Sequence, residues 1–128
     1  MQKSSPKIYC FVDNYNLTDL SKLSKDISII YRNYNKINHF NNILNLRKFC
    51  KLSKNKFYLS NNIKLSIKLG LDGIYIPSFN KQINYVGSFS LPINFRVIGS
   101  AHNISEIIIK QKQRCEEVFI SPVFKVLK

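Results

Sequence analysis

Acidic side chains, cysteines and long apolar runs are all scarce in this sequence. Only 7 Asp and Glu stand against 20 Lys and Arg, which gives a formal net charge of +13 at pH 7. Three widely spaced cysteines, Cys10, Cys50 and Cys115, form no C-x-x-C pair, so neither a disulfide framework nor a zinc site is supported, and we expect reduced core thiols. With no run of 18 apolar residues and no signal-peptide core, we expect a cytoplasmic, soluble protein without a membrane partner.

The positive charge is spread along the chain rather than gathered into one run. Only four of the basic residues are arginine, and the lysines extend from Lys3 to Lys128. Asn and Ile are abundant beside Lys, which fits AT-biased codon usage. We therefore interpret the positive charge as a result of biased composition, carried by solvent-exposed lysines, and expect no nucleic-acid partner. A net positive field would still attract phosphorylated small molecules.

Short apolar runs with helical or polar stretches between them predict six buried parallel strands. The length of 128 residues and the apolar content of 45% suit one domain with its own core. The predicted strands are residues 8–12, 27–31, 57–59, 73–76, 95–99 and 118–120.

Three helices are predicted between these strands. Residues 41–53 place four apolar side chains on one face, and residues 62–69 end at Gly70, a natural C-terminal stop. Asn103 and Glu106 form a variant of the capping box at the start of a third helix. The predicted buried stripe of that helix is Ile104, Ile107 and Ile108.

The alternation of strands and helices implies right-handed βαβ units and a parallel sheet. Periodicity alone leaves open whether that sheet is a barrel or an open doubly wound sheet. Two connections are less regular: residues 14–26 are short and polar, and residues 78–94 are predicted to be a loop with a turn of helix.

Four short sequence segments lie at the ends of predicted strands. They are IIYR at 29–32, LSNN at 59–62 with LGLDGIYI at 69–76, VIGSAHN at 97–103, and VFISPVF at 118–124. In this order they resemble the ends of strands two to six in the thiamine-phosphate synthase and TenI family, over most of residues 7–124. The resemblance implies a TIM-type barrel with its chemistry at the C-terminal ends of the strands.

The family continues with two more strands, whose glycine-rich and serine-rich loops hold a thiazole phosphate. The resemblance therefore implies an α/β chain that forms an incomplete TIM (β/α)8-type barrel of about six parallel strands with crossover helices, a single partial domain over residues 1–128. Six of eight strands leave two open edges, which invite pairing. We expect a truncated chain, either a fragment of a longer gene product or a sequence cut short in gene prediction; the alternative is a homo-oligomer that completes the barrel.

The resemblance implies substrate contacts for four residues. Arg32 matches an arginine that helps to hold pyrophosphate, a task for which a guanidinium fork is suited, although Tyr34 stands where the synthases have a lysine. Asn61 matches the Asn of the family's Asn-Asp pair. Ser100 is expected to donate to a substrate heteroatom, and Ser121 to contact the ligand or neighbouring loop backbone.

The family's magnesium positions are degenerate in this chain. Asn62 and Asn80 stand where the synthases have metal-binding aspartates, and Tyr75 replaces a histidine seen in many members. Amides remove two negative charges on which Mg²⁺ depends, so we expect no metal and no cofactor, with Mg²⁺ needed only if the chain acts as a synthase. Asn62 also fits a helix N-cap.

His102 matches the family histidine that serves as acid–base in the TenI-type thiazole tautomerases. Imidazole suits this task because its unperturbed pKa lies near ~6.5. His39 has polar neighbours and no motif around it, so we predict an exposed loop residue.

Three functions follow as hypotheses. The first is a thiamine-biosynthesis protein that binds a thiazole phosphate and moves a proton on it through His102, as a tautomerase does. The second is a magnesium-dependent thiamine-phosphate synthase that joins hydroxymethylpyrimidine pyrophosphate to thiazole phosphate. The third is a non-catalytic ligand-binding remnant.

Overall fold

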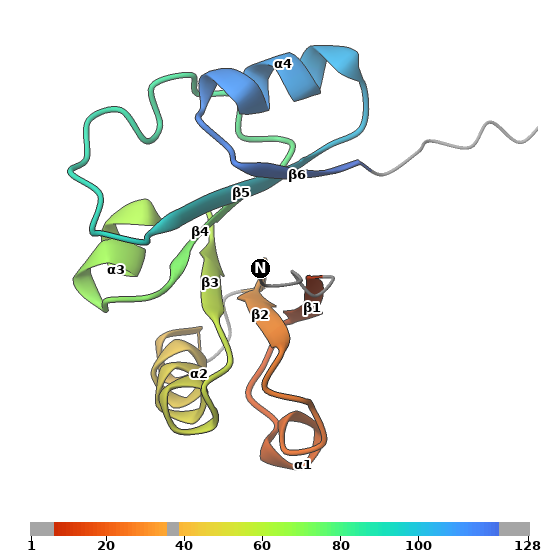
Figure 1. Ribbon diagram of the computed structural model, residues 1–128, viewed down its shortest axis with the longest axis vertical. Helices are drawn as coiled ribbons and strands as arrows, with labels where there is room; N and C mark the ends of the chain where they lie inside the picture. Colours follow the sequence, from red (N-terminus) through yellow and green to blue (C-terminus); the bar gives the residue numbers. More distant parts are fainter. Residues whose placement is uncertain (1–6, 36–38, 121–128) are drawn as a thin grey trace, which may run out of the picture.

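The six strands form one parallel sheet that curls into a half-barrel (Figure 1). The computed structural model describes residues 7–35 and 39–120. The strands follow one another across the sheet in chain order, and they are β1 (Ile8–Val12), β2 (Ile27–Tyr31), β3 (Phe57–Ser60), β4 (Gly73–Ile76), β5 (Arg96–Ala101) and β6 (Glu117–Ile120). The helices are α1 (Leu17–Leu20), α2 (His39–Ser53), α3 (Ile63–Lys68) and α4 (Ile104–Lys112). The predicted α/β architecture of an incomplete barrel is confirmed.

The strands lie where the apolar runs predict them. Strands β1, β2 and β4 have the predicted bounds, and the ends of the other three differ by one or two residues. Both faces of the sheet are buried over β3 and β4, as expected for parallel strands that carry helices on one side and a filled barrel interior on the other. An unbroken run of apolar residues is therefore a sufficient signal for these strands.

The helix ends follow their capping residues. The Asn62 side chain accepts a hydrogen bond from the backbone N–H of Leu65 at the start of α3, and Gly70 takes a φ of 66° just after its end. At α4, Asn103 accepts from the N–H of Glu106, while the Glu106 carboxylate accepts from the N–H of His102, one residue earlier than in a capping box.

The loops on either side of the sheet carry little regular structure. The polar connection 14–26 contains the single turn α1, which the sequence does not predict, capped by the Asn16 side chain. Residues 77–95 form a long loop of successive hydrogen-bonded turns without an α-helix. This loop leads from the carboxyl end of β4 back to the amino end of β5.

The predicted buried stripe of α4 is wrong. Ile104 and Ile108 are 75% and 46% exposed, whereas Lys110 is fully buried. The Lys110 stem crosses β5 at Gly99, where an added Cβ would lie only 2.8 Å from Lys110 Cδ. Because its ammonium group also finds acceptors in the 77–95 loop and in Gln113, the lysine is buried on the inner face of the helix.

The two faces of the sheet have separate cores. The outer face packs under helices: residues of β2 and β3 against Ile43, Leu46 and Cys50 of α2, and residues of β4 and β5 against α3 and the 77–95 loop. Full burial of one Leu or Ile side chain stabilises the fold by about 1.5–3 kcal/mol. The concave face is filled by a third cluster, made of Ile30, Tyr58, Tyr75 and Ile98 with Tyr9 and Phe119.

Side chains of the first and last strands meet across the concave face. The Tyr9 hydroxyl donates to the Glu117 carboxylate at 3.0 Å, and Lys7 pairs with the same carboxylate at 2.7 Å. The rings of Tyr9 and Phe119 pack edge to face with centroids 4.9 Å apart. Aromatic side chains therefore occupy the interior of the half-barrel between its two ends.

No helix in residues 7–35 and 39–120 has the length and apolar character that crossing a membrane would require. The three cysteines are free thiols. Cys50 is buried under α2, and Cys10 and Cys115 are half-buried. Burial raises the pKa of Cys50 to about 12 and that of Cys115 to about 11, so both stay protonated at neutral pH.

Candidate functional site

The predicted site residues gather at the carboxyl edge of the sheet. Because all the strands are parallel, the residues that follow each strand lie at the same edge. The residues brought to this edge are Arg32, Asn61, Asn62, Asn80, Ser100 and His102. Ser121 lies outside the described residues.

Two adjoining cavities open at this edge. The first, here called the arginine pocket, has a volume of about 410 Å³ and is lined by Phe11, Val12, Asp13, Arg32, Asn33, Tyr34 and Asn35. The second, the amide pocket, has a volume of about 270 Å³ and is lined by Tyr31, Asn33, Tyr34, His39, Ser60, Asn61, Asn62 and Phe79. Since Asn33 and Tyr34 line both, the two cavities are direct neighbours.

Arg32 is held by aromatic rings. Its guanidinium carbon lies 4.2 Å from the centroid of the Phe11 ring and 6.0 Å from that of Tyr34. Asp13 lines the same pocket, yet within the described part of the chain Arg32 makes no ion pair with any carboxylate. The Phe11 ring thus covers the guanidinium, and a side-chain hydrogen bond links the guanidinium to Tyr34. A guanidinium has five N–H donors, so others are suited to an anionic oxygen.

The three asparagines do not form a magnesium site. Asn80 Nδ2 donates to Asn61 Oδ1 at 2.7 Å, and Asn62 Oδ1 caps α3. At the two metal positions, Asn62 Oδ1 accepts from the N–H of Leu65 and Asn80 Oδ1 accepts from the N–H of Gln82 at 3.0 Å, so both side-chain oxygens already accept hydrogen bonds. In residues 7–35 and 39–120 there is also no group of three His, Cys, Asp or Glu side chains that could hold a metal ion. The residues present therefore do not fit Mg²⁺, which relies on carboxylate oxygens.

Ser100 shares its hydroxyl with Tyr75. The two oxygens are 2.6 Å apart, and Tyr75 is almost fully buried on the concave face. The hydroxyl of Tyr75 thus ties β4 to β5 near their carboxyl ends, and Ser100 is already engaged in that tie. A ligand that contacts Ser100 meets a hydroxyl pair rather than a lone serine.

His102 is an exposed residue that is oriented by Glu106. Its Nδ1 lies 3.2 Å from Glu106 Oε1, and its backbone N–H donates to the same oxygen at 2.7 Å. These contacts, led by the backbone hydrogen bond, hold the pKa of Glu106 below its ordinary value. His102 stands at the carboxyl edge, but it lines neither the arginine pocket nor the amide pocket.

His39 belongs to the amide pocket, so its prediction as an exposed loop residue is wrong. It is the first residue of α2 and is half-buried. Its Nδ1 lies 3.4 Å from the Tyr31 hydroxyl, and the two rings have centroids 5.4 Å apart. The apolar periodicity that begins just after His39 indicates a helix. Because the start of a helix that follows a parallel β-strand lies at the carboxyl edge of the sheet, this signal could have placed His39 near the site.

Lys110 and Gln113 anchor the loop that carries Asn80. Lys110 Nζ and Gln113 Nε2 both donate to the Asn80 carbonyl at 2.9 Å, and Gln113 also donates to the carbonyl of Gln82 at 3.0 Å. Burial lowers the pKa of Lys110. Nothing local in the sequence reveals this anchor, because its partners lie about 30 residues apart along the chain.

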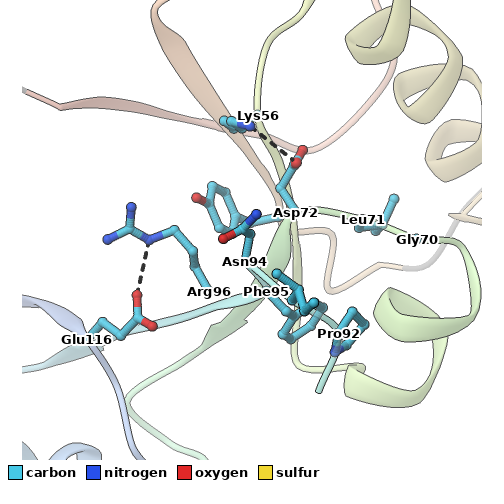
Figure 2. Close-up of a pocket in the computed structure, with 11 residues that line it drawn as sticks. Lys56, Gly70, Leu71, Asp72, Pro92, Asn94, Phe95, Arg96 and Glu116 are labelled. Atoms are coloured by element: carbon cyan, nitrogen blue, oxygen red, sulfur yellow. Dashed lines mark hydrogen bonds and ion pairs between the residues drawn. The ribbon is translucent and has the colours of Figure 1, made fainter. Parts of the chain in front are cut away.

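A larger cavity, of about 620 Å³, lies at the opposite edge of the sheet, where the strands begin (Figure 2). Its charged side chains are paired within the protein: Lys56 with Asp72 at 3.7 Å, and Arg96 with Glu116 at 3.0 Å. Asp72 also accepts from the backbone N–H of Phe57 at 2.8 Å. These contacts link the start of β3 to that of β4 and the start of β5 to that of β6, and we assign them a structural role.

Comparisons with known proteins leave the chain without a family assignment. No protein-family model matches the sequence, and no curated protein matches it significantly. The features that indicate a function are therefore the arginine pocket, the amide pocket and the four sequence segments at the strand ends.

Proposed function

We propose that this chain binds a small phosphorylated heterocycle of the thiamine-precursor class, a thiazole phosphate, at the carboxyl edge of its sheet in the cytoplasm. The observation that carries the proposal is the stacked Arg32 guanidinium beside a neutral, amide-lined cavity. A phosphate at Arg32 and a ring in the amide pocket place the two ends of such a ligand in matching surroundings. The resemblance to the thiamine-phosphate synthase and TenI family supplies the chemical class of the ring.

The proposed chemistry is proton transfer by His102. The Glu106 carboxylate next to Nδ1 favours the tautomer that carries its proton there, which makes Nε2 the basic atom. In a tautomerisation Nε2 takes a proton from a carbon of the ring system and returns one to another ring atom, so no atom is gained or lost. The amides at Asn62 and Asn80, where the synthases have aspartates, argue against a magnesium-dependent synthase.

A second candidate is binding without turnover. The position of His102 outside both pockets favours it. A sensor or a remnant needs Arg32 and the amide pocket but no acid–base group. The two candidates therefore make the same prediction for binding and opposite predictions for proton exchange.

Replacing Arg32 tests the binding site. Arg32→Gln is expected to weaken binding of thiazole phosphate by roughly 10-fold to 100-fold, because a charge-assisted hydrogen bond contributes about 1.5–3 kcal/mol. Titration calorimetry at fixed ionic strength measures the loss. The dephosphorylated thiazole alcohol should bind the wild type and Arg32→Gln equally.

The matched control for Arg32 is Arg114→Gln, an exposed arginine that follows α4 and makes the same change in net charge. It should leave binding of the phosphate unchanged. An equal loss in both variants would mean that only the overall field of the protein attracts the ligand. Failure of the wild type to bind thiazole phosphate at all would reject the proposed function.

Replacing His102 tests the chemistry. His102→Gln is expected to slow isotope exchange on bound thiazole phosphate by roughly 100-fold or more while the dissociation constant stays within a factor of two or so, because general acid–base catalysis contributes about 10²–10⁴ in rate. Exchange is followed by proton NMR in deuterated buffer. His39→Gln removes the imidazole that lines the amide pocket, so an equal loss of exchange in that variant would assign the proton transfer to His39 instead. Exchange that survives His102→Gln rejects the role of His102, and a wild type that binds without exchange identifies a non-catalytic binding protein.

A further inference from the structure

Ser60 is the last residue of β3, and it presents an unusual oxygen. Its Oγ is buried, and within the part of the chain that the structure describes it is the one buried side-chain polar atom without a hydrogen-bond partner. A buried hydroxyl that bonds neither to water nor to protein lowers the stability of a fold. Such an atom calls for an explanation, and a missing ligand is one.

The direction of Ser60 follows from the alternation of side chains along β3. Phe57 and Leu59 belong to the outer core under α2, whereas Tyr58 belongs to the concave cluster. Ser60 shares the face of Tyr58, since side chains alternate in a strand. Its Cα partner on β4 is Tyr75, whose hydroxyl already pairs with Ser100 at 2.6 Å. The hydroxyls of Tyr75 and Ser100 thus hydrogen-bond to each other, and neither pairs with Ser60 Oγ.

Among the described residues that line the amide pocket, Ser60 included, there is no Lys, Arg, Asp or Glu. Its polar lining consists of amides, hydroxyls and one imidazole, which donate and accept hydrogen bonds without a full charge at neutral pH. Two exposed rings, Tyr34 and Phe79, contact each other at its rim with centroids 5.9 Å apart. An ionised group held within the amide pocket itself would give up its hydration without meeting an opposite charge among the described lining residues; an anion would have to reach Arg32 in the adjoining arginine pocket to find one. An uncharged ring with a polar edge meets both hydrogen-bonding groups and aromatic faces.

We propose that Ser60 is a specificity-determining residue, whose Oγ hydrogen-bonds the polar edge of an uncharged heterocyclic ring bound in the amide pocket. The inference rests on the proposed function for the identity of the ligand and deepens it, because it assigns the ring, as distinct from the phosphate, to this pocket. Arg32 then governs whether a ligand with an anionic group binds, and Ser60 governs which ring it carries.

The first test needs no ligand. In Ser60→Ala the oxygen has no protein partner to lose, so the urea midpoint of the free 128-residue chain should stay the same or rise. Ser66→Ala is the matched control: Ser66 is also a buried serine, but its Oγ donates to the Asn62 carbonyl at 2.9 Å, so this variant should have a lower midpoint. If Ser60→Ala loses as much stability as Ser66→Ala, or does not fold, Ser60 Oγ has a structural partner and the inference is wrong.

The second test uses ring probes without phosphate. Neutral 2-pyridone and 2-aminothiazole should shift the backbone amide signals of Asn61 and Asn62 in ¹⁵N NMR titrations, and Ser60→Ala should weaken both roughly tenfold. Benzene, a neutral ring of similar size without a polar edge, should bind weakly if at all. Equal binding of benzene, or equal binding of the neutral polar probes to Ser60→Ala, overturns the inference, as does a wild type that none of the probes perturbs.

These outcomes separate the inference from the proposed function. If thiazole phosphate does not bind but the neutral rings do so through Ser60, the proposed function fails and the inference stands. If thiazole phosphate binds equally to the wild type and to Ser60→Ala, the inference fails and the proposed function stands.

Discussion

Gly73→Ala is expected to lower the free energy of unfolding by about 3 kcal/mol or more, an effect at the upper end for overpacking of a core. Gly73 is the first residue of β4, at the point where this strand passes between β3 and β5. A Cβ added there would lie 2.1 Å from the backbone oxygen of Arg96 and 2.7 Å from two ring carbons of Tyr58. The oxygen belongs to the sheet and the ring is buried, so neither is able to move without disturbing the ladder or the concave core.

Urea denaturation followed by circular dichroism measures this loss, with the soluble yield as a second readout. Gly87→Ala is the matched control, because an added Cβ at Gly87 meets only the Asn84 oxygen at 3.8 Å. Both variants restrict the unfolded chain equally, and this effect alone stabilises by about 0.4–1 kcal/mol. Similar midpoints for the two variants would show that β4 has more room between its neighbours than the structure gives it.

The elements of the fold were predictable because their signals are local. A run of apolar residues predicts each strand, and the caps Asn62 and Asn103 with the stop at Gly70 predict three helix boundaries. The parallel order of strands then brings Arg32 and Asn61 to one edge, whichever side chains they finally contact. Signals within a few residues of each other are sufficient for this much of the candidate site.

The errors concern contacts between distant parts of the chain. Lys110 is buried because the Asn80 carbonyl accepts a hydrogen bond from its ammonium group and Gly99 leaves room for its stem. No periodicity within α4 reveals either contact. His39 is half-buried because the Tyr31 ring lies beside it at the end of β2. Hydrophobic periodicity predicts that a lysine or a histidine is exposed. These two residues are buried or half-buried only because of their contacts with distant parts of the chain.

The site itself depends on such distant pairings. Asn61 and Asn80 are 19 residues apart, yet their amides meet at 2.7 Å because Lys110 and Gln113 hold the backbone of Asn80 in place. The unpaired Ser60 oxygen is a property of the β3–β4 register, which the sequence does not specify to one residue. Residue types at strand ends therefore predict where a site lies, while its chemistry follows from the register and the loops.

Raising the pH from 9 to 11 is expected to lower the free energy of unfolding by about 2 kcal/mol through Cys50 alone. Burial under α2, assisted by the charge of Asp72, raises the pKa of this thiol from 9.0 to about 12. The unfolded chain loses the thiol proton near pH 9 while the folded chain keeps it, so the contribution is complete below pH 9 and is lost as the pH rises toward 12. Each pH unit in that window costs about 1.4 kcal/mol.

Tyr58 adds to this loss above pH 10. It is almost fully buried in the concave core, and burial raises its pKa from 10.0 to about 12. At pH 11 the added loss is about 1.4 kcal/mol, and the sign is the same because the folded phenol again keeps a proton that the unfolded chain has lost. Since typical domains are stable by only about 5–15 kcal/mol, the two groups together remove a substantial part of the stability.

Urea titrations at pH 7, 9, 10 and 11 separate these groups from the lysines, which titrate in the same range and are common to all variants. Cys50→Ala lowers stability at pH 7 through the cavity that it leaves, but its curve should fall less steeply than the wild type between pH 9 and 11. Tyr58→Phe should be flatter only above pH 10. If the free energy of unfolding falls with pH equally in the wild type and Cys50→Ala, water reaches the thiol under α2. The packing of α2 on β2 and β3 would then be looser than in the structure.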